Sequence, residues 1–388
     1  RYKHMTEDTT LSSAGISQDV PGEPAADQRQ GIQELLSDGA INGANGEAKN
    51  VGSWSKDYQE LTGLVRQKGL LAKQPRYYAA NFLITLSMLG FGIAILAVTD
   101  ALWVHLLDAV LLSTVFARLA FLGHDVGHRQ IFRSTRRNDM TGLGIALLLG
   151  MERTWWVEKH NRHHSNPNQM GIDPDMDIPV LAFSQDDARS KKGLYRLIVR
   201  YQTWLFYPML SMEGMLGLRL AGFIYLLHNK GKYPGIEQLL FAGHFVIYFG
   251  LLFYLLPTSH AVGFIVIHQL LFGLHMGAVF APNHKGMPIL EKGSEIDYLT
   301  QQVVTARNIK PSPFIDFMYG GLNYQIEHHL FPNMPRNRLG EAQEIVRAFC
   351  LERSLSYHET GVFRSHREIL GYFNENSAPL RKSSSRSS

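Results

Sequence analysis

The amino-acid sequence predicts an all-α integral membrane protein with four transmembrane helices in two hairpins and a helical cytosolic cap that carries clusters of histidine. Three observations lead to this prediction: two long apolar stretches without Lys or Arg, basic residues gathered outside these stretches, and histidine clusters close to their ends. The mean hydropathy of −0.10 hides the apolar stretches, because it averages them with polar segments.

Two long stretches of the chain lack Lys and Arg. The first lies between Arg76 and Arg118, and the second lies between Lys232 and Lys285. One polar or proline-containing break divides each stretch into two halves. A helix needs about 20 apolar residues to cross a bilayer, and each half is close to that length. Two hairpins therefore cross the membrane four times. The predicted spans are residues 77–98, 101–123, 239–256 and 260–281.

The basic residues lie in the segments that flank the two hairpins. Of the 38 Lys and Arg residues, all but Arg118 occur before residue 77, between residues 124 and 232, or from residue 285 onward. Two hairpins place these three segments on one face, and the positive-inside rule makes that face cytosolic. Both termini are therefore predicted in the cytosol, with a bacterial cell membrane favoured and the endoplasmic reticulum as the alternative. Four adjacent segments of this length disfavour the competing interpretation, buried core helices of a soluble protein.

The segments outside the hairpins divide the rest of the chain. Residues 1–49 are rich in Gly, Ser, Gln, Asp and Ala without periodicity, which predicts a disordered tail. Residues 50–76 place apolar positions at helical spacing among basic residues, which predicts an amphipathic helix on the membrane surface. Residues 77–376 are predicted to form the main domain, and residues 377–388 a disordered basic tail.

Two further apolar segments fall short of a regular span. Residues 140–151 are too few to cross a bilayer and predict an interfacial or re-entrant segment. Residues 204–228 are long enough, but Pro208, Glu213 and Arg219 interrupt them. One extra crossing there would also place the basic segments on opposite faces. Neither segment is therefore predicted to span.

Histidine is abundant and cysteine almost absent. The chain has 17 His and 1 Cys, which excludes a disulfide framework, a cysteine-based zinc site and an iron–sulfur cluster. The histidines form three clusters, in the sequences GHDVGH, KHNRHH and QIEHH, on the predicted cytosolic face. Spacings of three and four residues place side chains on one face of a helix. The clustered residues are His124, His128, His160, His163, His164, Gln325, His328 and His329.

The number of clustered imidazoles indicates two metals. Seven imidazoles exceed the four ligands of a structural zinc and the three of a catalytic zinc. Imidazole binds iron, copper and zinc alike, so the ligand type alone does not select the metal. The sequence has no H-E-x-x-H helix and no carboxylate ligand set, which disfavours two hydrolytic zincs. Redox chemistry on an alkyl chain of the bilayer is the better fit.

The order HD-x-G-H, H-x-x-H-H and Q-x-x-H-H, with two hairpins between and around these boxes, resembles the membrane fatty acid desaturases from about residue 58 to residue 349. The resemblance implies two iron ions, O2 as co-substrate, and removal of two hydrogens from adjacent methylenes of an acyl chain. It implies that the seven clustered histidines bind iron, together with His284 in APNHKGM after the last span. The Q-x-x-H-H form is similar to that of the front-end subgroup, which inserts double bonds on the carboxyl side of the chain. Gln325 replaces a histidine of many members, and it either binds through its amide oxygen, acts through water or does not bind.

Acidic residues near the boxes are candidates for positioning the ligands. Asp125 and Glu327 adjoin predicted ligands, and a ligating imidazole usually gives its other N–H to a carboxylate or carbonyl. An ordinary solvated acid is the alternative for both. The sequence GIDPDMDI begins like a calcium-binding loop, but it lacks the required Gly and Glu at later positions and predicts a helix or turn cap instead.

Four other residues are candidates for lining a substrate tunnel. Trp155 and Trp156 precede the second box, although an aromatic belt at the membrane surface explains them equally well. His268 and His275 lie inside a predicted span, seven residues apart and so on one helix face. Plain packing with a backbone hydrogen bond is the alternative for these two histidines.

The predicted partners are a fatty acyl substrate linked to CoA or lipid, the lipid bilayer, and a source of electrons. Some front-end relatives carry a fused cytochrome b5 domain, but the H-P-G-G haem motif is not found here, so the donor is expected to be a separate ferredoxin, cytochrome b5 or flavin reductase. The net charge of +4 gives no reason to expect nucleic acid. Two other functions stay open: a di-iron acyl or alkyl hydroxylase, and a zinc-dependent membrane hydrolase or metal-binding receptor.

Overall fold

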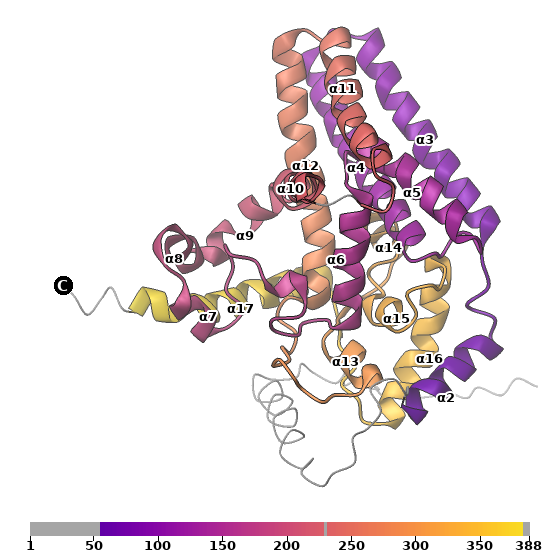
Figure 1. Ribbon diagram of the computed structural model, residues 1–388, viewed down its shortest axis with the longest axis vertical. Coiled ribbons are helices and arrows are strands. Elements are labelled where there is room, and N and C mark those ends of the chain that lie inside the picture. Colours follow the sequence, from indigo (N-terminus) through magenta and orange to yellow (C-terminus); the bar gives the residue numbers. More distant parts are fainter. Residues whose placement is uncertain (1–54, 229–230, 383–388) are drawn as a thin grey trace, which may run out of the picture. The chain divides into compact units, whose positions relative to one another are not determined.

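Four long apolar helices form two hairpins in the computed structural model, which describes residues 55–228 and 231–382 (Figure 1). These are the helices of the described residues that are individually long and apolar enough to cross a membrane. The prediction of an all-α membrane fold with four spans is confirmed. The helices are α3 (Pro75–Val98), α4 (Leu102–Gly127), α11 (Ile236–Leu255) and α12 (Thr258–His284).

Helices α4 and α12 are the inner pair, and α3 and α11 expose more of their surface. Large apolar side chains such as Leu83, Val246 and Tyr254 point outward from the outer helices, as expected of a lipid-facing surface. Inside, Phe116 and Phe272 belong to a core of buried apolar residues. The bilayer thus replaces water as the solvent of the outer surface, so these helices need no polar face.

Shorter elements surround one end of the four spans. A small parallel sheet pairs β1 (Asn308–Ile309) with β2 (Glu359–Thr360). The shorter helices before the second hairpin are α2 (Lys56–Gln67), α5 (Thr135–Leu149), α6 (Arg153–Ser165), η1 (Pro174–Met176), α7 (Gln185–Ser190), α8 (Gly193–Arg200), α9 (Gln202–Ser211), η2 (Gly214–Leu220) and α10 (Ala221–His228). Those after it are α13 (Tyr298–Val304), α14 (Pro313–Tyr319), α15 (Gln325–Leu330), η3 (Arg336–Arg338), α16 (Leu339–Glu352) and α17 (Val362–Lys382).

The chain between α4 and α6 is shaped by helix caps. The Ser134 side chain accepts a hydrogen bond from the Arg137 amide at the start of α5, and Gly150 ends that helix in a left-handed conformation. Glu152 then caps α6 by accepting from the amides of Thr154 and Trp155. Helix α5 packs along α4 and α11. The caps therefore set where α6, which carries the second histidine box, begins.

Residues 204–228 do not form one straight helix. Helices α9 and η2–α10 together have the length and hydropathy of a span, but they meet at a bend of 63°. Buried Arg219 donates to the Leu149 carbonyl at 2.8 Å and to Gln269. Gly273 of α12 lies so close to α9 that an added Cβ would collide with the Ser211 carbonyl. The bent segment is thus held against the inner spans.

The helix predicted within residues 50–76 is present as α2, but its buried apolar residues pack against protein. Helix α2 covers Lys56–Gln67, and its buried residues Leu61 and Val65 pack in an apolar cluster with α13, α15 and α16. Arg353, just after α16, also forms ion pairs with Asp57 and Glu60. The apolar stripe of α2 therefore faces protein, a choice that periodicity alone does not reveal.

The prediction of a disordered tail from residue 377 is wrong as far as residue 382. Helix α17 continues to Lys382, and Ser377 and Leu380 are buried. Ser377 Oγ donates to the Phe373 carbonyl at 2.7 Å, which stabilises the last turns. Residues 383–388 and the predicted disordered tail at residues 1–49 lie outside the described residues.

Candidate metal centre

Eight histidine side chains converge at one end of the inner spans. They come from α4 and its C-cap, α6, the last residue of α12, and α15, segments that are far apart in the sequence. The structure thus brings together all three predicted histidine clusters and His284. One group contains His124, His128, His160, His164 and His328, and the other contains His163, His284 and His329; within each group the ligand nitrogens lie within 4.8 Å of one another.

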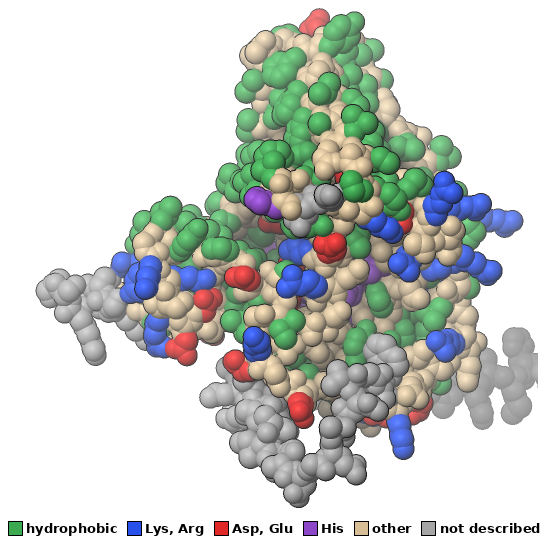
Figure 2. All heavy atoms as spheres, viewed as in Figure 1, with side chains coloured by type: hydrophobic (Ala, Val, Ile, Leu, Met, Phe, Trp, Pro, Cys, Tyr) green, Lys and Arg blue, Asp and Glu red, His purple; other side chains and the backbone are tan. Residues whose placement is uncertain are grey.

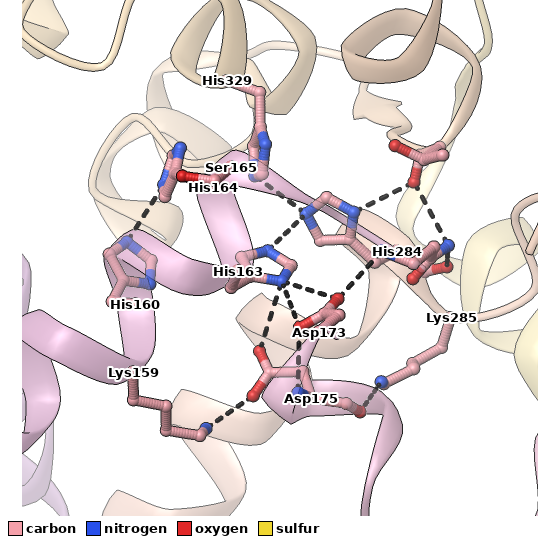
Figure 3. Close-up of polar contacts among 12 residues, drawn as sticks. Lys159, His160, His163, His164, Ser165, Asp173, Asp175, His284, Lys285 and His329 are labelled. Atoms are coloured by element: carbon pink, nitrogen blue, oxygen red, sulfur yellow. Dashed lines mark hydrogen bonds and ion pairs between the residues drawn. The ribbon is translucent and has the colours of Figure 1, made fainter. Parts of the chain in front are cut away.

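The three-histidine group has its Nε2 atoms pointing toward a common centre (Figure 3). The Nε2 atom of His284 lies 3.3 Å from that of His163 and 3.0 Å from that of His329. The outer nitrogen, Nδ1, of each imidazole meets a hydrogen-bond acceptor, so Nδ1 carries the hydrogen and Nε2 presents a lone pair. The pairs are His163 with Asp173 at 3.0 Å, His284 with the Thr305 carbonyl at 2.9 Å, and His329 with Gln302 Oε1 at 2.8 Å.

The five-histidine group is held together by short nitrogen–nitrogen approaches. The Nε2 atoms of His160 and His128 are 2.9 Å apart, those of His164 and His160 are 3.1 Å apart, and those of His328 and His164 are 3.2 Å apart. The His124 ring lies 4.6 Å from the rings of both His128 and His328. Burial and neighbouring imidazoles hold the pKa of His128, His160, His164 and His328 well below the ordinary value. Uncharged imidazole is the form that binds metal.

Asp173 is a site residue whose position beside a histidine was not predicted. Its carboxylate accepts from His163 Nδ1, from the Asn168 amide at 2.8 Å and from the Asp175 amide at 2.9 Å. Burial lowers the pKa of His163, but the carboxylates of Asp173 and Asp175 outweigh it and the net shift is upward. The predicted cap is present, because Asp173 caps η1. Asp173 follows His163 by only ten residues, and this short separation was the sequence signal that could have indicated their contact.

Asp175 extends this network outward (Figure 3). It forms an ion pair with Lys159 at 2.5 Å, and Lys285 Nζ donates to its backbone carbonyl at 2.7 Å. These two lysines connect the middle of α6 and the C-terminal end of α12 to the loop that carries Asp173. The loop is thereby tied to two elements that supply histidines.

Gln325 belongs to the three-histidine group by position. Its Nε2 lies 3.0 Å from His284 Nε2, and its Oε1 accepts from Asn283 Nδ2 at 2.9 Å. The buried Asn283 Oδ1 has no hydrogen-bond partner among the described residues. Turning both amides by 180° preserves their mutual hydrogen bond and presents Gln325 Oε1 to the imidazoles. Gln325 therefore has the reach and the support of a fourth ligand.

The two predicted acidic neighbours differ. Asp125 lies 3.4 Å from His124 Nδ1 and forms an ion pair with Arg336 at 3.0 Å. Glu327 instead accepts from Asn308 at 2.7 Å and from Tyr357 at 2.8 Å, with no imidazole among its hydrogen-bond partners in the described chain. Consecutive helical side chains diverge by about 100°, so Glu327 points away from the side that His328 faces. Neither the predicted hydrogen bond to a ligating imidazole nor the solvated-acid alternative describes Glu327 in the described chain, because its carboxylate is buried, which raises its pKa to about 7.

One of the two tryptophans contacts the centre. Trp156 stacks on His160 with ring centroids 4.6 Å apart, and its edge meets His124 at 5.8 Å. Trp155 lies under Lys159, whose ammonium is 5.9 Å from the indole ring. Only Trp156 therefore shields the histidines directly.

His275 makes the backbone hydrogen bond of the packing alternative, whereas His268 bonds to a side chain. His268 Nδ1 lies 2.9 Å from the Tyr248 hydroxyl, and His275 Nε2 lies 2.8 Å from the Met318 carbonyl. His268 also packs against the Phe116 ring. The buried Nε2 atom of His268 has no hydrogen-bond partner among the described residues. A role of the two histidines at a substrate tunnel stays a prediction.

A cavity of about 560 Å³ opens beside His128. Its lining does not include Trp155, Trp156, His268 or His275. Its walls are mostly polar or charged, with Arg153 and Lys232 both paired to Asp139. The lining residues are Gly127, His128, Arg129, Asp139, Arg153, Thr154, Val157, Glu158, Asn161, Tyr225, Gly231 and Lys232.

Four apolar spans with a buried cluster of eight imidazoles define a membrane protein with a candidate binuclear metal centre. Residues 101–361 match the fatty acid desaturase family, and the chain belongs to that family. The predictions of a fatty acid desaturase and of an oxidoreductase are thus confirmed at the level of the family.

Relatives of known name support the same assignment. An acyl-lipid (9-3)-desaturase of Physcomitrium patens is 30% identical over 319 residues, which cover 79% of this chain and 60% of that protein. A delta(6)-fatty-acid desaturase of Caenorhabditis elegans is 33% identical over 326 residues, covering 80% and 72%. A delta(5) fatty acid desaturase of the same nematode is 30% identical over 315 residues, covering 78% and 70%. The match thus spans less than two thirds of the moss protein.

Proposed function

We propose that this chain is an O2-dependent fatty acyl desaturase that introduces a cis double bond into an acyl chain linked to CoA or lipid. One observation carries the proposal: eight imidazoles from four separate segments form two groups at the end of apolar helices. The relatives named as delta(6) and delta(5) desaturases, together with the Q-x-x-H-H box, support insertion on the carboxyl side of the chain.

The two histidine groups fit two iron ions. In the three-histidine group, His284 Nε2 lies 3.0 Å from His329 Nε2 and 3.3 Å from His163 Nε2. With the ring hydrogens on Nδ1, the lone pairs of these nitrogens repel one another unless a cation lies among them. In the five-histidine group, burial and neighbouring imidazoles lower the pKa of His128, His160, His164 and His328, which favours their uncharged form. When bound, two irons supply the activation of O2 and the removal of hydrogens from adjacent methylenes. Zinc would bind the same imidazoles but has no redox chemistry.

The chain's own residues hold the ligands in place and exclude water. Asp173, Gln302 and the Thr305 carbonyl fix three imidazoles with Nε2 inward. Gln325 supplies a further oxygen ligand to that group. Asp125, held by Arg336, orients His124. Such outer partners set the direction and basicity of ligating imidazoles.

The cavity beside His128 suits the polar end of the acyl carrier. It is close to the five-histidine group and lined by both basic and acidic residues. This end of the spans carries the basic segments, so it faces the cytosol. Two electrons per turnover come from a separate ferredoxin, cytochrome b5 or flavin reductase on that face. A bacterial cell membrane and the endoplasmic reticulum are both compatible with this arrangement.

The product of the reaction tests the proposal. The full chain is expressed in a host with a defined fatty acid supply and a compatible electron donor, and the acyl chains are analysed by gas chromatography and mass spectrometry. We expect new cis double bonds on the carboxyl side of the existing ones. Hydroxylated chains without new double bonds would assign the hydroxylase alternative, and hydrolysed lipid with stoichiometric zinc would assign the hydrolase.

Asp173→Ala is expected to weaken metal binding by about 10- to 100-fold, because loss of an outer carboxylate frees the imidazole of His163. Asp173→Asn keeps an acceptor and a cap without the charge, so its loss should be smaller. Iron retained per chain during titration with a chelator measures the effect independently of turnover. Asp177→Ala, at the exposed end of the same short helix, is the matched control. Equal iron retention in Asp173→Ala and the control would contradict the role of Asp173.

A further inference from the structure

Helices α8 and α9 expose an apolar stripe that nothing in the described chain covers. Leu194 is 68% exposed and Trp204 is 82% exposed. The opposite face of the two helices is buried and includes Val199 and Phe206. On that side both helices contact α17, and α9 also contacts α12. The stripe recurs at intervals of three and four residues, as on one side of a helix. Its members are Leu194, Leu197, Tyr201 and Trp204, with Tyr195 beside them.

This stripe is continuous with the lipid-facing surface of the spans. Beyond α9, η2 and α10 expose apolar side chains, including Leu216 and Leu227, and the series leads to Leu239 at the start of α11. Both α9 and η2 pack against α12. Figure 2 shows hydrophobic side chains gathered over the α8–α9 region on the side nearer the apolar spans, with Lys and Arg side chains next to them.

The charges of this segment are of one sign. From residue 191 to residue 212 the sequence has four basic residues and no Asp or Glu: Lys191, Lys192, Arg196 and Arg200. Lys191 pairs with Asp187 of α7, whereas Lys192 and Arg196 are exposed and have no acidic partner within α8 or α9. Basic residues beside an exposed stripe of Leu, Tyr and Trp are typical of a helix in the plane of a membrane surface.

We propose that α8 and α9 lie in the surface of the bilayer, with the apolar stripe among the acyl chains and Lys192 and Arg196 on anionic lipid headgroups. Continuity with the spans favours lipid as the occupant, because a bilayer that surrounds α11 and α12 reaches this stripe without a new partner. The excess of positive charge selects anionic lipids. The proposal does not depend on the reaction that the chain catalyses.

Depth measurements at single labelled positions test the placement. The chain's single cysteine, Cys350, is fully buried, so a nitroxide can be attached to Leu197→Cys in otherwise native full-length protein. In nanodiscs of phosphatidylcholine and phosphatidylserine, the label at 197 should collide several-fold more with O2 than with a water-soluble nickel complex. Asp186→Cys on α7, whose side chain is 92% exposed, is the aqueous control and should show the reverse order.

Two results would overturn the placement. A label at 197 that is as open to nickel as the control would show a water-facing helix, and a label shielded from both reagents would show that protein covers the stripe. A second measurement avoids the new cysteine: Trp204→Phe should remove a share of tryptophan fluorescence that brominated lipid quenches. Unchanged quenching would contradict lipid contact.

Varying the lipid composition tests separately whether Lys192 and Arg196 bind anionic headgroups. Raising the phosphatidylserine fraction should increase the O2 preference of the label at 197, since each basic residue near an anionic surface adds about fivefold to local binding. Lys192→Glu combined with Arg196→Glu should abolish that dependence. A dependence that survives the double substitution would remove these two residues from the proposal.

Discussion

Replacing His328 with alanine is expected to lower double-bond formation by more than about 100-fold while the chain still inserts into the membrane, and the same holds for His124→Ala and His160→Ala. Each of the three imidazoles belongs to the five-histidine group, where rings lie 4.6 to 5.0 Å from that of His124. Removal of one ring leaves a metal with an incomplete ligand set. Product analysis by gas chromatography measures activity, and iron per chain measures occupancy.

The control for these substitutions is His228→Ala. His228 is exposed at the end of α10, and its Nδ1 meets the Ile224 carbonyl at 2.8 Å, outside both histidine groups. Activity and iron content should stay at the level of the unsubstituted chain. Retained activity in two of the three cluster variants, with normal membrane insertion, would contradict the assignment of the site.

Arg307→Met is expected to lower the free energy of unfolding by about 3–5 kcal/mol, the usual cost of removing one partner from a buried ion pair. The Arg307 side chain is 0% exposed and pairs with Glu368 of α17. It also donates to the carbonyls of Pro282 at 2.7 Å and Lys285 at 2.8 Å, on either side of His284. Thermal unfolding of the purified protein in detergent measures the loss, and weaker iron retention should accompany it.

Arg364→Met is the matched control, because Arg364 contacts the same carboxylate of Glu368 but is 44% exposed. Solvent screening makes such an exposed pair worth about 0–1 kcal/mol. Equal destabilisation by the two substitutions would show that burial of Arg307 is not the source of its effect. A loss confined to Arg307→Met would show that this buried side chain couples α17 to the end of α12.

Much of the centre could be predicted from short stretches of sequence. The pairs His124 with His128 and His160 with His164 are four residues apart, and each pair lies in one group. The adjacent residues His328 and His329 fall into different groups, because neighbours on a helix point about 100° apart. His163 separates from His164 for the same reason. Helical spacing within each box thus explains why its histidines divide between the two groups. Each group is completed by histidines from helices that are distant in the sequence.

The sequence by itself determined the four spans and the histidine boxes, because hydropathy and helical spacing are properties of contiguous residues. Only the tertiary structure decided the rest. It placed Asp173 and Gln302 behind ligands, turned Glu327 toward Asn308, and gave α2 a protein partner while leaving the stripe of α8 exposed. These outcomes depend on which distant segments pack together. A periodic pattern shows that a helix has an apolar face, but packing decides whether protein or lipid covers it.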